Sequence, residues 1–213
     1  MIFVNKLTIY CGVDILLGAL AVLALALSLD GCAALQPAPE PNVHVLAATP
    51  LTPVARAKRD LVLEVTAPRA WPGFDTLQMV YVQRPYELDY FATARWADTP
   101  ARMLGPLLAQ ALEQTESFRA VVQTPSAIPA DVRVNAELIR LQQDFTTRPS
   151  QVELSVRVEL IDVRAKRVLA SRVFDAMAPA LTENAYGGVA AANVALQRVL
   201  EQVADFCVAE SAR

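Results

Sequence analysis

Apolar and polar residues alternate with the two-residue period of a β-strand along much of the chain after residue 60. The clearest segment is QVELSVRVELIDV (151–163), in which valine or leucine takes every second position up to Leu160. Segment 131–145 alternates in the same way until its phase shifts at Ile139 and Leu141, which predicts a β-bulge. Further strands are predicted at 61–66, 77–82, 86–91 and 167–176, the second and third forming a hairpin.

Two segments carry the apolar stripe of an amphipathic helix. The first follows Thr99, a favourable N-cap residue, with Pro100 at the first helical position, and Pro106 predicts a bend in its first turns. The second occupies 184–210 near the end of the chain. Its apolar stripe is Val189, Ala192, Leu196, Val199, Leu200, Val203 and Phe206. Strands followed by a helix, twice over, predict an α+β fold: an antiparallel sheet with two helices packed on one face.

The N-terminal region has a different pattern. Segment 15–29, ILLGALAVLALALSL, has no charged residue and is shorter than the ~20 residues of a membrane-spanning helix. Its length suits the apolar region of a signal peptide, although an uncleaved membrane anchor is the alternative. It ends in Leu29-Asp30-Gly31-Cys32, which is similar to a bacterial lipobox except at Asp30. Cys32 is therefore the candidate site of lipidation.

A proline-rich segment follows Cys32, with prolines at 37, 39, 41, 50 and 53, and it predicts an extended tether. The predicted organisation is a lipoprotein signal peptide over 1–31, a tether over 32–60 and one domain over 61–213. Ala33, rather than aspartate, follows the cysteine, and the sorting rule of enteric-type bacteria then predicts the outer membrane.

Composition excludes several classes of function. The 213 residues carry a net charge of −3 without a dense basic stripe, which argues against nucleic-acid binding. Of the three cysteines, Cys11 lies in the leader and Cys32 accepts lipid, so Cys207 remains alone and is predicted to be buried in the last helix. No intramolecular disulfide is then expected in the mature chain.

Candidate catalytic chemistry is sparse. His44, the single histidine, falls in the predicted tether, where it cannot serve a Ser-His-Asp or Cys-His mechanism in the domain or form a metal site alone. Gly187 and Gly188 could bind an anion at the start of the last helix, but a flexible turn leading into the helix is favoured. The sequence therefore predicts no catalytic, metal-binding or cofactor-binding residue, and no enzyme.

Aromatic residues and arginines are concentrated between residues 81 and 96. Such a group is either core packing or a protein contact surface, since tyrosine, tryptophan and arginine are enriched at interfaces. The candidate interface residues are Tyr81, Arg84, Tyr86, Tyr90, Arg95 and Trp96.

The same stretch resembles the core signature of the ABC-type transport auxiliary lipoproteins, a family of small lipoproteins that accompany MCE-type lipid transport systems. The matching positions are Tyr81, Arg84, Pro85, Glu87, Leu88, Tyr90, Phe91, Arg95, Trp96, Asp98, Pro100 and Leu104. The resemblance extends over 61–208 and places a strand at 117–122.

The resemblance implies a non-enzymatic lipoprotein on the periplasmic side of the outer membrane. Its implied partners are an MCE-domain protein, with an inner-membrane permease and an ATPase, and the implied role is to dock this assembly at the outer membrane. A ring of copies is one arrangement that the resemblance allows. Two alternatives stay open: a domain that itself binds lipid, and a structural envelope lipoprotein unrelated to transport.

Overall fold

The computed structural model of the chain describes residues 40–51 and 58–211. The predicted signal peptide, Cys32 and the first part of the predicted tether lie outside the described residues. Residues 41–213 group into one compact unit. The unit is an α+β domain, which confirms the predicted fold class.

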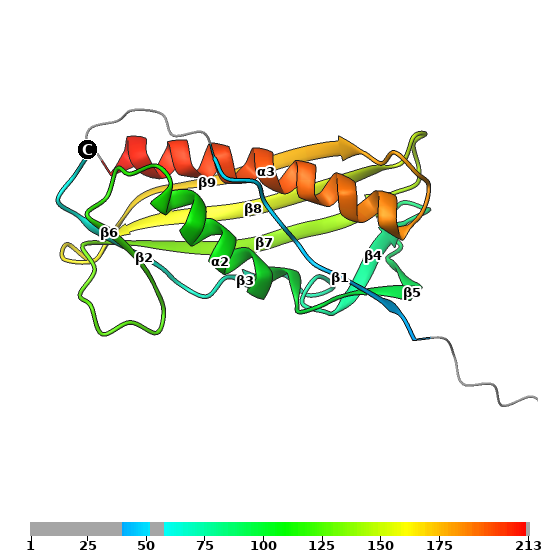
Figure 1. Cartoon of the computed structure of the whole chain (residues 1–213), viewed down its shortest axis with the longest axis horizontal. Coiled ribbons are helices and arrows are strands. Elements are labelled where there is room, and N and C mark those ends of the chain that lie inside the picture. Colours follow the sequence, from blue (N-terminus) through cyan, green and yellow to red (C-terminus); the bar gives the residue numbers. More distant parts are fainter. Residues whose placement is uncertain (1–39, 52–57, 212–213) are drawn as a thin grey trace, which may run out of the picture. The chain divides into compact units, whose positions relative to one another are not determined.

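Three long strands form one side of the sheet, with β9 at its edge. β7 (Val132–Asp144), β8 (Gln151–Asp162) and β9 (Arg167–Pro179) pair antiparallel in chain order, and Figure 1 shows them running side by side. The register of β7 on β8 shifts between Leu138 and Arg140, which confirms the predicted bulge. In β7 and β8 the alternation seen in the sequence places the valine and leucine side chains on one face, which is buried, while the polar side chains lie on the other face.

The other edge of β7 pairs with three short strands placed one after another. β2 (Val62–Val65), β3 (Arg69–Ala70) and β4 (Gln78–Val82) all run parallel to β7. β6 (Ala120–Gln123) extends the sheet beyond β2 in parallel. Antiparallel β5 (Asp89–Trp96) and then parallel β1 (Asn42–His44) extend it beyond β4.

The sheet is therefore mixed, and the prediction of a wholly antiparallel sheet was wrong. The cause is α2 (Pro100–Glu113), a helix that carries the chain back across the sheet. β6 and β7 follow this helix and so start at the same end of the sheet as β2. A connection of this length is what parallel pairing requires.

Two predicted boundaries also change. The third predicted strand, 86–91, is replaced by β5, which starts at Asp89 because Tyr86 adopts a φ of +69° in the turn before it. Residues 42–51, assigned to the tether as part of the proline-rich segment 32–60, lie on the domain. The backbone N–H groups of Ala47 and Thr49 donate to Asn193 and Gln197 of the C-terminal helix, each at 3.0 Å.

Both helices cover the same face of the sheet. α2 packs on β7 and β6, and α3 (Ala185–Glu210) packs on β8 and β9 (Figure 1). The seven residues of the predicted α3 stripe are all buried, and Pro100 occupies the first turn of α2 as predicted. Thr99 holds the N-cap position, but its hydroxyl makes no capping hydrogen bond. α2 continues through Pro106.

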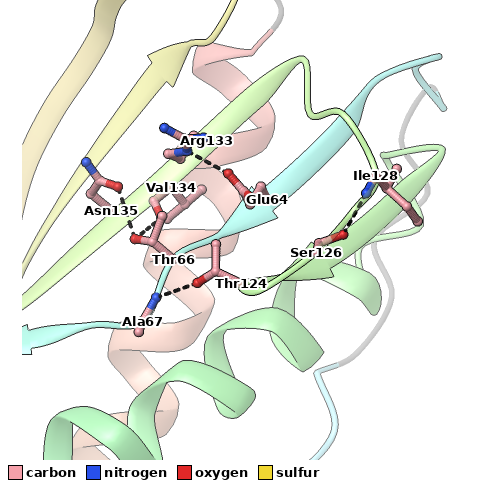
Figure 2. A network of polar contacts seen from close by, with 9 residues as sticks. All are labelled: Glu64, Thr66, Ala67, Thr124, Ser126, Ile128, Arg133, Val134 and Asn135. Atoms are coloured by element: carbon pink, nitrogen blue, oxygen red, sulfur yellow. Dashed lines mark hydrogen bonds and ion pairs between the residues drawn. The ribbon is translucent and has the colours of Figure 1, made fainter.

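A polar network holds β2 between its two neighbours (Figure 2). The Glu64 carboxylate of β2 lies 2.6 Å from the guanidinium of Arg133 on β7, and the Glu64 side chain is only 8% exposed. The Thr66 hydroxyl donates to Asn135 at 3.0 Å, and the Ala67 N–H donates to Thr124 at 3.1 Å. These bonds tie the end of β2 to segments about 60 to 70 residues away in the sequence.

We expect Arg133→Met to lower the free energy of unfolding by about 1–3 kcal/mol, because it leaves the Glu64 carboxylate buried without its partner. The 41% exposure of the Arg133 side chain keeps the loss below that of a fully buried pair. Urea unfolding would measure it. The matched control is Arg102→Met, whose ion pair with Asp98 is exposed and should contribute no more than about 1 kcal/mol. Equal losses in the two variants would contradict a special role for the Glu64 pair.

Candidate interaction surface

The structure divides the six predicted interface residues between core and surface. Trp96 is 4% exposed and belongs to the hydrophobic core. Tyr81 is half-buried, whereas Arg84, Tyr86, Tyr90 and Arg95 are exposed. The two alternatives from sequence, core packing and contact surface, therefore apply to different members of the set.

The half-buried aromatic residues fix the β4–β5 hairpin to the central sheet. The ring of Tyr81 lies 4.7 Å from that of Phe91, on the neighbouring strand, and 5.8 Å from that of Phe145, just after β7. Phe91 and Phe145 are themselves 6.3 Å apart and close to edge-on. Contacts of this geometry are favourable beyond the area they bury. They give the exposed tip of the hairpin a rigid base.

The tip of this hairpin presents Tyr86 to solvent. Tyr86 is completely exposed, and its positive φ turns the chain sharply between the two strands. Arg84 and Glu87 flank it as an exposed ion pair with a nitrogen–oxygen distance of 3.0 Å. A positive φ is uncommon for a tyrosine, so the side chain is displayed at some cost in backbone energy.

A groove of about 670 Å³ lies beside the hairpin, between the β1–β5 edge and the start of α3. It is lined by Asn42, Val43, His44, Phe91, Thr93, Ala94, Glu183, Asn184, Ala185 and Tyr186. The groove was not predicted from the sequence, because its walls come from three segments that are far apart in the chain. One of these segments was assigned to the tether. The alternating residues Val43 and Val45 were the available signal for a strand there.

The two glycines at the start of α3 are explained by packing. The Asn184 side chain accepts the N–H of Gly187 at 2.9 Å and so occupies this end of the helix. A Cβ on Gly187 would lie 2.1 Å from the carbonyl oxygen of Thr182, and one on Gly188 would lie 2.2 Å from the Gln143 side chain. The glycines therefore allow close approach inside the first turn of α3, and they do not form a flexible turn ahead of it.

The loop before α3 is fixed to the β7–β8 turn. The backbone N–H of Ser150 donates to the Glu183 carboxylate at 2.9 Å, and Ala180 donates to the Ser150 carbonyl at 2.7 Å. Hydrogen bonds from the backbone and side chain of Ser150 hold the pKa of Glu183 below its ordinary value, and the charge of Arg148 adds to this. The loop is thus positioned by a charged acceptor.

Among the described residues, the space between this part of the sheet and α3 is small. One small cavity between sheet and helices, lined in part by Met79, Trp96 and Gly188, measures about 10 Å³, close to the space of one water. Cys207 is buried in α3, as predicted, and desolvation raises the pKa of its thiol to about 12. Within residues 40–51 and 58–211 there is no cluster of histidine, cysteine and acidic residues suited to a metal. No helix in those ranges is long and apolar enough to cross a bilayer.

The described residues thus define an α+β module whose distinctive feature is an exposed surface at one end of the sheet. The family described as ABC-type transport auxiliary lipoprotein component matches residues 44–204. The chain belongs to this family, as the resemblance in the sequence predicted. None of the curated proteins matches the chain.

Solved structures share this fold. A DUF330 protein from Xanthomonas campestris is 21% identical, with a TM-score of 0.73 over 80% of this chain and 97% of its own. An uncharacterised protein, 12% identical, has a TM-score of 0.63 over 78% of this chain and 98% of its own. A hypothetical protein from Chlamydia trachomatis, 13% identical, has a TM-score of 0.52 over 73% and 100%. At these identities the likeness concerns the fold alone.

Replacing Glu183 by Gln should make the protein less stable at neutral pH, because the Ser150 N–H then donates to a neutral acceptor. A lowered pKa in the folded state means that the ionised carboxylate stabilises the fold above the carboxyl's ordinary value near 4.5. This stabilisation is lost as the pH falls through the lowered pKa. Urea unfolding at pH 7 and pH 3 should therefore show a difference between wild type and variant that shrinks at pH 3. A difference that is independent of pH would contradict this role of the charge.

Proposed function

We propose that this protein is a non-enzymatic, lipid-anchored component of an MCE-type ABC transport system, facing the periplasm from the outer membrane. Cys32 supplies the anchor, and the domain docks the MCE-domain protein, which works with an inner-membrane permease and an ATPase. The observation that carries the proposal is positional. The exposed aromatic and arginine residues lie at the end of the sheet from which the chain enters β1, and Cys32 precedes β1 in the sequence by ten positions.

Strand register supports this placement. Val82, the last residue of β4, pairs with Asp144, the last residue of β7, so the β4–β5 tip projects beyond the end of β7. β5 runs back from the tip, and β1 lies parallel to it with Asn42 opposite Ala94 and His44 opposite Trp96. The chain therefore enters β1 from the side of the tip. We call this end of the sheet the anchor end: the β4–β5 tip, the β7–β8 turn, the β9–α3 loop and the start of β1.

The chemistry of the domain supports a binding role. The one histidine, His44, lies on the exposed edge strand β1, and the one cysteine of the domain has a thiol too basic to ionise near neutral pH. Tyrosine and arginine at an exposed tip are the residues that protein contacts favour. A docking component needs a rigid, displayed surface of this kind.

Lipid binding inside the domain is the alternative, and it is less well supported. Pockets for small-molecule ligands measure about 300–1,000 Å³ and enclose most of the ligand. The cavity between the sheet and the helices, at about 10 Å³, is far below that range, and the groove of about 670 Å³ beside the hairpin falls within it but lies open at the surface. A docking role requires no internal cavity.

The anchor is tested by Cys32→Ala. We expect the variant to fold, as judged by circular dichroism, because Cys32 precedes the compact unit that begins at Pro41, but to be lost from the outer-membrane fraction. Sucrose-gradient fractionation of the membranes followed by immunoblotting measures this. A variant that remains in the outer membrane would show that Cys32 is not the attachment site.

The docking surface is tested by the double substitution Arg84→Ser and Tyr86→Ser. We expect reduced co-purification of the MCE-domain protein from detergent-solubilised membranes, with anchoring unchanged. The matched control is Ile128→Ser, since Ile128 is 52% exposed and lies four residues before Val132, the start of β7, whereas the hairpin tip lies beyond the other end of that strand. Figure 2 shows Ile128 in the loop that leads to β7. Undiminished capture by the double variant would rule out the hairpin tip as the docking surface.

A further inference from the structure

We propose that the anchor end makes a second, non-covalent contact with the membrane, in which Leu181, Tyr186 and Val43 enter the interfacial region of the bilayer. The proposal deepens the function above and rests on its lipid anchor at Cys32. Phospholipid would then cover the opening of the groove between the β1–β5 edge and the start of α3.

Exposure of large apolar side chains is greatest at this end. Leu181 is 91% exposed and Tyr186 is 72% exposed, and only Tyr86, on the neighbouring hairpin tip, exceeds them among the described residues. Val43 adds a third side chain across the groove, at 53%. Val43 and Tyr186 line the groove, and Leu181 lies two residues before Glu183, another of its lining residues. Singly exposed apolar residues are common on protein surfaces, but several at one end of a domain mark a contact site.

These side chains are displayed on a fixed support. Leu181 precedes Thr182, whose carbonyl accepts the N–H of Asn184 at 2.9 Å. Glu183 in the same loop is bonded to Ser150 of the β7–β8 turn, and Tyr186 lies in the first turn of α3. The loop therefore holds Leu181 away from the core while its backbone is bonded on both sides.

Chain length places this end near the membrane. Ten residues separate Cys32 from Asn42, and a fully extended chain spans at most about 3.3–3.6 Å per residue, or about 35 Å here. The opposite end of the sheet is farther by the length of β7, whose 13 residues correspond to about 40 Å. Of the two ends, the one that exposes Leu181, Tyr186 and Val43 is the one that the anchor keeps close to the bilayer.

The side chains at this end favour contact with the interfacial region of a bilayer over contact with a charged partner. Tyrosine is favoured at the boundary between headgroups and acyl chains, because its ring is apolar and its hydroxyl is polar. Charges at this end have both signs, with Arg84 and Arg148 against Glu87, Asp89 and Glu183. Attraction to anionic lipid through a basic cluster is therefore not the basis of the contact, and the contact should be insensitive to salt.

Site-specific labelling of the full lipidated chain tests this proposal. In Leu181→Cys the new thiol is the reactive one: Cys32 carries lipid, Cys11 leaves with the leader, and Cys207 is buried with its pKa raised. The thiol is labelled with an environment-sensitive fluorophore, and the protein is reconstituted in vesicles of phosphatidylethanolamine and phosphatidylcholine without any partner protein. Ile128→Cys, at the opposite end of the sheet, is the matched control.

We expect the label at residue 181 to shift its emission to shorter wavelength on reconstitution and to lose fluorescence when nitroxide-bearing phospholipid is included, at low and high salt alike. The label at residue 128 should show neither change. A chain that floats with the vesicles while label 181 stays unquenched overturns the membrane contact and leaves the anchor intact. In that case the groove faces a protein partner or a second copy. A chain that does not float with the vesicles overturns the anchor and this inference together.

Discussion

Pairing along both edges of β7 is the constraint on which the rest of the structure depends. One edge carries β8 and β9, and the other carries β2, β3 and β4 in succession. Every strand thereby acquires its register, directly or through one neighbour or two, from a single 13-residue strand. A slip of β7 by one residue would turn Val134 and Leu138 away from the helices and expose their apolar surface, so burial fixes the register.

This register gives the domain two distinct ends. The turn residues that follow β4, β7 and β9 meet at one end, and the chain enters β1 from the same end. The aromatic cluster of Tyr81, Phe91 and Phe145 joins the hairpin to β7 there. Surface features that are scattered in the sequence become neighbours because they all lie at the Asp144 end of β7. Their proximity supports our assignment of the docking and membrane surfaces.

Local periodicity explains which parts of the structure could be predicted from the sequence. The long strands and both helices follow from alternation or helical stripes within a single segment, and the bulge follows from a phase shift at Ile139. Parallel pairing of β2 with β7 joins residues about 70 positions apart and leaves no local pattern. Residues 42–51 were assigned to the tether because prolines lie on both sides of them and they show no sustained apolar period, yet a three-residue edge strand needs only three favourable positions.

The surface was harder to predict than the fold, because residue type does not separate burial from display. Trp96 and Tyr86 belong to one aromatic segment, but Trp96 sits on the helix-covered side of β5 and Tyr86 sits in a turn that no element covers. Leu181 and Tyr186 lie in a short loop and a first helical turn, where a sequence offers no periodicity that assigns a face. Their exposure follows from the bonds of Glu183 and Asn184, which hold the loop backbone against the β7–β8 turn and the start of α3. In this domain the polar contacts of the loop backbone determine where its apolar side chains point, and through them which surface is available to a bilayer.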